Sequence, residues 1–156
     1  MNRTLAFTFV AVFSIFLGSQ ITEGCLFVPY WQRLSKTAFY EYYSIFGPAI
    51  NNFYTSLTIV AVLIPVCSSI YCYYKKSPAL KYALVSTFFA CSVIIIFYLY
   101  FKDVNQQFYA AAFDTNQLKS VLSDWERWHW LRVVLELGAL IFLIMTQHVL
   151  IKNSKA

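Results

Sequence analysis

Four stretches of this 156-residue chain are almost wholly apolar, and most of its polar positions gather between them. The apolar stretches cover residues 5–28, 50–74, 80–101 and 124–150. An α-helix needs about 20 residues to cross a bilayer, and each stretch is long enough to do so. The pattern therefore predicts an all-α fold, a polytopic membrane four-helix bundle that forms a single transmembrane domain over residues 1–156.

The segments between these stretches predict two coverings for one end of the bundle. Aromatic residues recur at helical spacing over residues 35–46, which predicts a short helix on the bilayer surface or over the bundle mouth. Residues 102–122 form the longest predicted loop, with a second short helix inside it. Ser123 and Glu126 match a capping box, which predicts that the last helix starts there.

Composition agrees with a membrane protein in contact with a lipid bilayer. Only 12% of the residues are charged and 60% are hydrophobic, whereas a soluble domain carries about 25% charged residues. The group of basic residues at the N-terminus, in the connection between the second and third stretches and at the C-terminus has no acidic residue beside it. In the other two connections the positive and negative charges sum to zero. By the positive-inside rule this group predicts cytoplasmic N- and C-termini, and it gives no reason to expect a nucleic-acid partner. The group consists of Arg3, Lys75, Lys76, Lys81, Lys152 and Lys155.

A polar stripe runs along the last predicted helix. Trp125, His129, Arg132 and Glu136 are spaced by four, three and four residues, so they share one helical face. Ionisable groups inside a bilayer are costly and usually face a protein interior or a water-filled cavity. The three ionisable members of this stripe are therefore candidate catalytic residues, and Trp125 is a candidate substrate-binding residue.

Other polar groups are predicted at the same depth on the first two helices. Glu23 is a fourth candidate catalytic residue. The further candidate substrate-binding residues are Trp31, Asn51, Asn52 and Thr55. The simplest packing brings all these groups together in a polar pocket in the outer half of the bundle. An alternative stays open, in which Arg132 pairs with Glu23 or Glu136 only to hold the bundle together.

The residue types favour acid–base chemistry over a metal or cofactor. A di-iron bundle needs about four carboxylates and two histidines, and Arg132 would repel a cation between Glu23, His129 and Glu136. We therefore expect no metal and no cofactor. His129 can take a proton near neutral pH, Arg132 can stabilise an oxyanion, and Glu23 or Glu136 can orient them.

The run from Gly18 to Glu23, the Pro29-x-Trp31 pair and the W-x-x-x-H-x-x-R pattern ending at Arg132 resemble one known family. They are similar to the anthrone oxygenase-like family of small four-helix membrane proteins, which is largely of unknown function. Members with a known activity are fungal enzymes that oxidise an anthrone to an anthraquinone with molecular oxygen and no evident cofactor. The resemblance implies that His129 and Arg132 belong to the site and that Trp125 lines it.

The leading prediction is a cofactor-independent oxygenase or oxidase for a small lipophilic, anthrone-like aromatic, with His129 as the base and Arg132 as the oxyanion donor. The alternative is a non-enzymatic membrane subunit or a protein that binds a small molecule or lipid. Transport is less favoured, because a single four-helix chain lacks the inverted repeats and broken helices of transporters. A homo-oligomer, or a place as one subunit of a membrane complex, is a further expectation.

Overall fold

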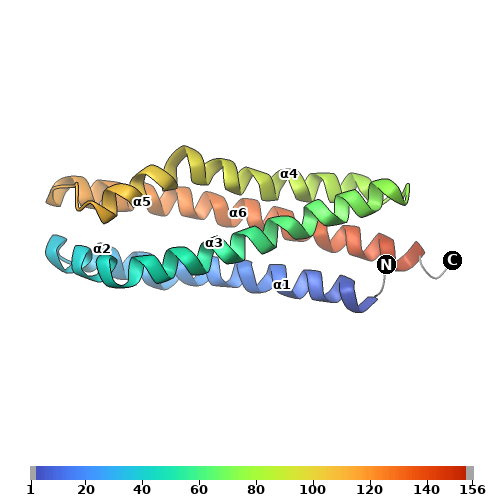
Figure 1. Cartoon of the computed structure of the whole chain (residues 1–156), viewed down its shortest axis with the longest axis horizontal. Helices are drawn as coiled ribbons and strands as arrows, with labels where there is room; N and C mark the ends of the chain where they lie inside the picture. The colour runs from blue at the N-terminus through green and yellow to red at the C-terminus, as the bar shows by residue number, and fades with distance from the viewer. Residues whose placement is uncertain (1–2, 154–156) are drawn as a thin grey trace.

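The computed structural model describes residues 3–153, and it is an all-α bundle of four long helical stretches (Figure 1). Lys155 and both ends of the predicted domain 1–156 lie outside the described residues. Each stretch is long and apolar enough to cross a membrane, as expected for an integral membrane protein. The stretches are α1 (Arg3–Thr22) with η1 (Glu23–Phe27) and α2 (Val28–Arg33), then α3 (Lys36–Tyr74), then α4 (Leu80–Ile96) with η2 (Phe97–Phe101) and α5 (Lys102–Tyr109), and α6 (Thr115–Asn153).

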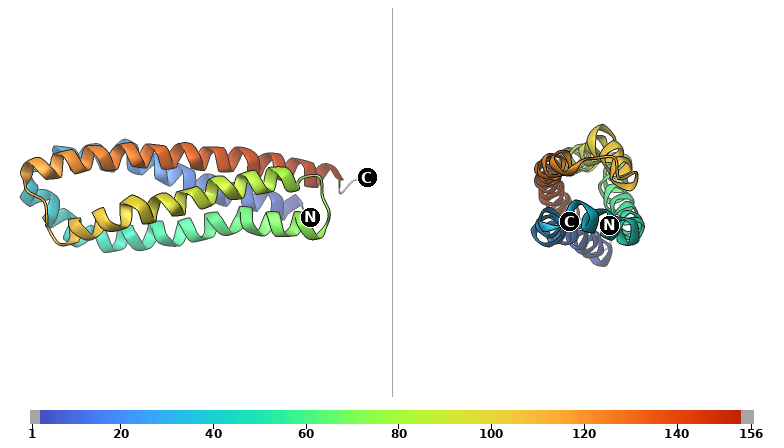
Figure 2. Two further views of the ribbon diagram at one scale, coloured as in Figure 1. Left: turned by 90° about the horizontal axis from the view of Figure 1, so that it is seen from above. Right: turned by 90° about the vertical axis from the view of Figure 1, so that its left-hand side faces the viewer.

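The four stretches alternate in direction along one long axis. The start of α1, the end of α6 and the connection between α3 and α4 lie at one end of the bundle (Figures 1 and 2). The connections from α2 to α3 and from α5 to α6 lie at the other end, and the view down the axis shows the helices arranged around a common centre. The predicted alternation of four spans therefore appears in the fold, while the side of the membrane that each end faces stays a prediction.

The second helix begins earlier than its hydrophobic pattern predicts. Ser35 caps α3, since its Oγ accepts a hydrogen bond of 3.2 Å from the Ala38 amide. The separate surface helix predicted over residues 35–46 is wrong, because α3 continues through Gly47 and Pro48 without a break. Packing overrides the low helix propensity of Pro48. The centroids of the Phe39 and Phe108 rings lie 5.1 Å apart, so this part of α3 packs on α5.

The last helix also begins earlier, and its capping box is a different one. The Asp114 carboxylate accepts bonds from the backbone amides of Asn116 and Gln117, and the Gln117 side chain accepts one from the Asp114 amide at 2.9 Å. The start predicted at Ser123 is therefore wrong, and the long loop over 102–122 reduces to residues 110–114. His129 lies about 21 Å from the true start of α6, at 1.5 Å per residue.

Aromatic side chains fill the bundle at the end formed by α2, the start of α3, α5 and the start of α6. We call this group the aromatic cluster, and its rings meet edge to face or stacked at centroid distances near 5 Å. It consists of Trp31, Phe39, Tyr43, Phe101, Phe108 and Trp125, all at most 8% exposed. A second core occupies the middle of the bundle; most of its residues are aliphatic, among them Leu17, Ala61, Ala90 and Leu143, and we call it the aliphatic core.

Candidate functional site

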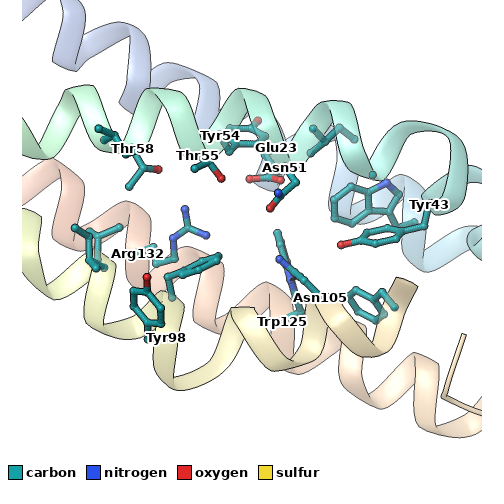
Figure 3. A pocket seen from close by; sticks show the side chains of 18 residues that line it. Glu23, Tyr43, Asn51, Tyr54, Thr55, Thr58, Tyr98, Asn105, Trp125 and Arg132 are labelled. Carbon is teal, nitrogen blue, oxygen red and sulfur yellow. Dashed lines mark hydrogen bonds between the residues drawn. The ribbon is translucent and has the colours of Figure 1, made fainter. Parts of the chain in front are cut away.

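A cavity of about 250 Å³ lies between α3, the α4–η2–α5 stretch and α6, between the aromatic cluster and the aliphatic core (Figure 3). Its wall combines apolar side chains with polar ones from all four stretches. The polar ones are Glu23, Tyr43, Asn51, Tyr54, Thr55, Thr58, Tyr98, Asn105 and Arg132.

Six of the nine residues singled out from the sequence line this cavity. They are Glu23, Trp31, Asn51, Thr55, Trp125 and Arg132. Their grouping follows from helical spacing, since Asn51 and Thr55 share a face of α3 and Trp125 and Arg132 share a face of α6. His129, Glu136 and Asn52 do not line it: the first two are buried behind the wall, and Asn52 is exposed on α3.

Arg132 extends its guanidinium group into the cavity (Figure 3). The side chain is 7% exposed, and its Nε has no hydrogen-bond partner. Among residues 3–153 no carboxylate oxygen lies within 4.0 Å of it. Its charged carbon lies 4.7 Å from the centroid of the Phe101 ring, a cation–π contact. Because arginine stays charged in proteins, the cavity contains a fixed positive group that pairs directly with no carboxylate among the described residues.

Gln20 joins Arg132 to Glu23, and it was not among the predicted site residues. With its amide oriented so that both ends have partners, its oxygen accepts from Arg132 at 2.9 Å and its nitrogen donates to Glu23 at 3.2 Å. Gln20 is completely buried. A pointer to it was present in the sequence, since Gln20 precedes Glu23 by three residues and therefore shares its helical face.

His129 is buried behind Glu23. Its Nε2–H donates to the backbone carbonyl of Gln20 at 2.9 Å, because a carbonyl can only accept. Its Nδ1 then lies 3.7 Å from the nearer Glu23 oxygen, and the Trp125 ring stacks on the imidazole at 5.1 Å. The absence of a side chain at Gly24 permits this approach, since a Cβ there would come within 3.0 Å of His129. The imidazole therefore contacts the cavity only through Glu23 and Trp125.

Glu136 lies one helical turn beyond Arg132, toward the aliphatic core. The residue is 1% exposed, and neither carboxyl oxygen has a hydrogen-bond partner among the described residues. It does not line the cavity, and its oxygens lie more than 4.0 Å from the Arg132 nitrogens. The expected alternative, a bundle held by a direct ion pair of Arg132 with Glu23 or Glu136, is therefore not what the structure shows.

Two π-helical segments border the cavity. In η1 the widened turn carries Glu23, and in η2 it carries Phe97 and Tyr98, which line the wall. Single π-turns inside α-helices change the direction of the side chains that follow, and they are frequent at functional sites. Asn105, just beyond η2, accepts a hydrogen bond of 3.2 Å from the Trp125 indole. Nothing in the apolar pattern of these segments predicted either π-turn.

Metal binding finds no support in the side-chain arrangement. Within residues 3–153, no three His, Cys, Asp or Glu side chains lie close enough together to hold a metal ion. The four cysteines are all free.

Comparisons with other proteins do not assign this chain to a family. No protein-family model matches it, and comparisons with curated proteins and with solved structures find no similar protein. The resemblance to the anthrone oxygenase-like family therefore stays a prediction from the sequence, and the geometry of the cavity is what a functional proposal has to start from.

Proposed function

We propose that this integral membrane protein binds a small lipophilic molecule with an oxygen acceptor, and that Arg132 recognises that oxygen. The observation that carries the proposal is a buried arginine in a cavity wall with no carboxylate oxygen within 4.0 Å of its nitrogens, among the described residues. An arginine that only stabilised the bundle would have its donors paired, because buried charges without partners are strongly unfavourable. A ligand oxygen would complete the hydrogen bonds of this guanidinium group.

The walls of the cavity favour a flat, apolar ligand body. Trp31, Phe97, Phe108 and Trp125 contribute ring surfaces to it, and aromatic faces pack well on planar rings. The cavity of about 250 Å³ is smaller than most ligand cavities, which have volumes of about 300–1,000 Å³, so it suits a small molecule of a few rings. Anthraquinone, with two carbonyl oxygens on three fused rings, is a suitable probe, and anthracene is the matching hydrocarbon without oxygen.

The test is equilibrium binding of these two probes to the purified protein in lipid nanodiscs. We expect anthraquinone to bind more tightly than anthracene, and Arg132→Met to remove the difference. A hydrogen bond to a charged group contributes about 1.5–3 kcal/mol, so the loss should be at least about tenfold in affinity. Arg127→Met is the matched control, since Arg127 is an exposed arginine on the same helix that pairs with Asp124. Equal affinities for both probes, or an equal loss in both variants, would refute the proposal.

A second candidate function, the cofactor-free oxidation of an anthrone-like substrate, rests on the position of Glu23. This carboxyl group lines the cavity opposite Arg132 and has His129 directly behind it. In this reaction Glu23 accepts a proton from the activated C–H of the substrate, and Arg132 stabilises the enolate oxygen. The resulting carbanion reduces O₂ and bonds to it as a peroxide anion, which takes the proton back from Glu23 to form a hydroperoxide. The hydroperoxide loses water to leave the quinone. His129 acts here as a positioning residue for Glu23.

Oxygen consumption with anthrone tests this activity separately from binding. We expect Glu23→Gln and Arg132→Met each to lower the enzyme-dependent rate at least about tenfold, which corresponds to about 1.4 kcal/mol of lost transition-state stabilisation. Arg127→Met should retain the wild-type rate. If wild-type protein consumes no oxygen above the spontaneous rate but still binds anthraquinone, the protein is a binding protein and the second candidate is refuted.

For the orientation, we propose that the bundle end with Arg3, Lys75, Lys76, Lys81 and Lys152 faces the cytoplasm. This end carries basic residues without acidic ones, whereas charges of both signs occur at the other end. The aromatic cluster and the cavity then belong to the opposite half of the membrane. Modification of single cysteines at the two ends by a membrane-impermeant reagent in intact cells tests this orientation.

A further inference from the structure

The cavity is closed along the axis of the bundle. At the end with the α2–α3 and α5–α6 connections, the rings of the aromatic cluster cover the cavity. Phe39 and Phe108 of this cluster are at most 2% exposed. On the other side, the aliphatic core fills the bundle, with Ala61 and Ala90 also at most 2% exposed. A ligand therefore has no direct route into the cavity from the water at either end.

The cavity does reach the surface at the side of the bundle. Asn51, Thr55 and Ile59 follow one another at intervals of four residues on α3, and all three line the cavity and are exposed. Across the cavity, Tyr98 of η2 also lines it and is 63% exposed. Figure 3 shows the Arg132 guanidinium group between Thr55 and Tyr98. We call this opening between α3 and η2 the lateral mouth.

The spacing of lysines on the third helical stretch places the lateral mouth within the bilayer. Lys81 and Lys102 are 21 residues apart, or about 31 Å at 1.5 Å per residue, which matches a hydrocarbon thickness of about 30 Å. Tyr98 precedes Lys102 by four residues, so it lies about 6 Å inside this boundary. The Lys102 ammonium group lies 5.7 Å from the Tyr98 ring centroid, a cation–π contact at this boundary.

We propose that the cavity takes its ligand sideways from the bilayer through the lateral mouth. The substrate class is then a lipophile dissolved in that leaflet, with a carbonyl or phenol oxygen at the end that enters first. That oxygen reaches Arg132, and any apolar remainder too large for about 250 Å³ stays among the acyl chains. This inference rests on the proposed binding function, and it adds the route and the physical state of the ligand.

A measurement without any ligand tests the position of the mouth. Nitroxide spin labels are attached singly at residues 55, 63 and 41 of α3, after Cys25, Cys67 and Cys91 are replaced by alanine, and the protein is placed in nanodiscs. Leu63 is exposed in the apolar middle of α3, and Glu41 is exposed at the charged end. If the mouth opens to lipid, the nitroxide at residue 55 should have a higher collision rate with dissolved oxygen than with a water-soluble nickel chelate. The nitroxide at residue 63 should show the same preference. A label at Thr55 that favours the nickel chelate, as at Glu41, would overturn the proposal.

Two variants of the mouth test the route itself, with anthraquinone in the nanodisc lipid and quenching of tryptophan fluorescence as the readout. Thr55→Trp should narrow the mouth and slow association at least tenfold. Leu63→Trp, two turns further along α3 and outside the cavity, should stay within twofold of the wild type. Tyr98→Ala should widen the mouth and speed association. Both tryptophan variants add one exposed ring, so they are matched in bulk and in fluorescence.

The outcomes separate the two proposals. If Thr55→Trp and Tyr98→Ala bind anthraquinone at the rate of Leu63→Trp, lateral entry is refuted while the binding function stands. If the wild-type protein binds no anthraquinone, the proposed function fails by itself. The spin-label collisions then still decide whether the mouth opens to lipid or to water.

Discussion

Replacing Gly24 by alanine should destabilise the bundle by displacing the imidazole behind the cavity. A Cβ at this position would lie 3.0 Å from His129 Cδ2 and 3.0 Å from Trp130 Cζ2. Carbon atoms in contact prefer about 3.5–4.0 Å, so at least one ring has to move by about half an ångström. The His129 ring has little freedom to do so, because Trp125 stacks on its face and Gln20 accepts its Nε2–H.

The size of the effect follows from the cost of overpacking a close-packed interior. Inserted methyl groups typically cost about 1–3 kcal/mol, so we expect a loss of about 2 kcal/mol in the free energy of unfolding. This corresponds to a fall of about 30-fold in the ratio of folded to unfolded protein. Reversible unfolding by increasing fractions of dodecyl sulfate in mixed micelles, followed by circular dichroism, measures it.

Gly18→Ala is the matched control on the same helical stretch. A Cβ at Gly18 would meet no atom within 4 Å, and alanine is the better helix former by up to about 1 kcal/mol. Gly18→Ala should therefore be neutral or slightly stabilising. If the free energies of unfolding of the two variants lie within about 0.5 kcal/mol of each other, η1 does not pack closely on His129, and Gly24 is not needed to admit the imidazole.

Two further predictions concern the connection that closes the end of the bundle. Tyr40→Phe should lower the free energy of unfolding by about 1–2 kcal/mol, because the Tyr40 hydroxyl both donates to the Phe113 carbonyl and accepts from the Phe113 amide. The same unfolding assay measures this loss. An unchanged midpoint would contradict the bridge between α3 and this connection. Asp114→Ala should lower the free energy of unfolding by about 1 kcal/mol, because it removes the cap of α6. Amide hydrogen exchange should become faster at Asn116 and Gln117 and stay unchanged at Ser123. Faster exchange at Ser123 alone would favour a last helix that starts at Ser123.

The sequence predicted those parts of the fold that depend on hydrophobic periodicity. The four spans and the shared face of Trp125 and Arg132 follow from composition and from the 3.6-residue period of a helix. The helix ends were predicted less well, because Ser123–Glu126 and Asp114–Gln117 fit the same capping pattern. The two possible helix starts are distinguished by packing: the first turns of α6 pack against the aromatic cluster, where Leu118 is 3% exposed.

The candidate site was predicted in outline, but the π-turns at its border were missed. Spacing brought Glu23, Thr55 and Arg132 to one depth, and all three line the cavity. The π-turns were not predictable, because they depend on how neighbouring helices pack and leave no local pattern of residues. His129, on the same face of α6 as Arg132, packs against Gly24 of η1 and lies behind it instead of lining the cavity.

The most direct measurement of the central claim is an experimental structure of the protein in nanodiscs with anthraquinone. We predict density for the three rings in the cavity between α3, η2 and α6, with one carbonyl oxygen about 2.9 Å from a terminal nitrogen of the Arg132 guanidinium group. Rings bound elsewhere, or rings in the cavity whose oxygens point away from Arg132, would contradict it.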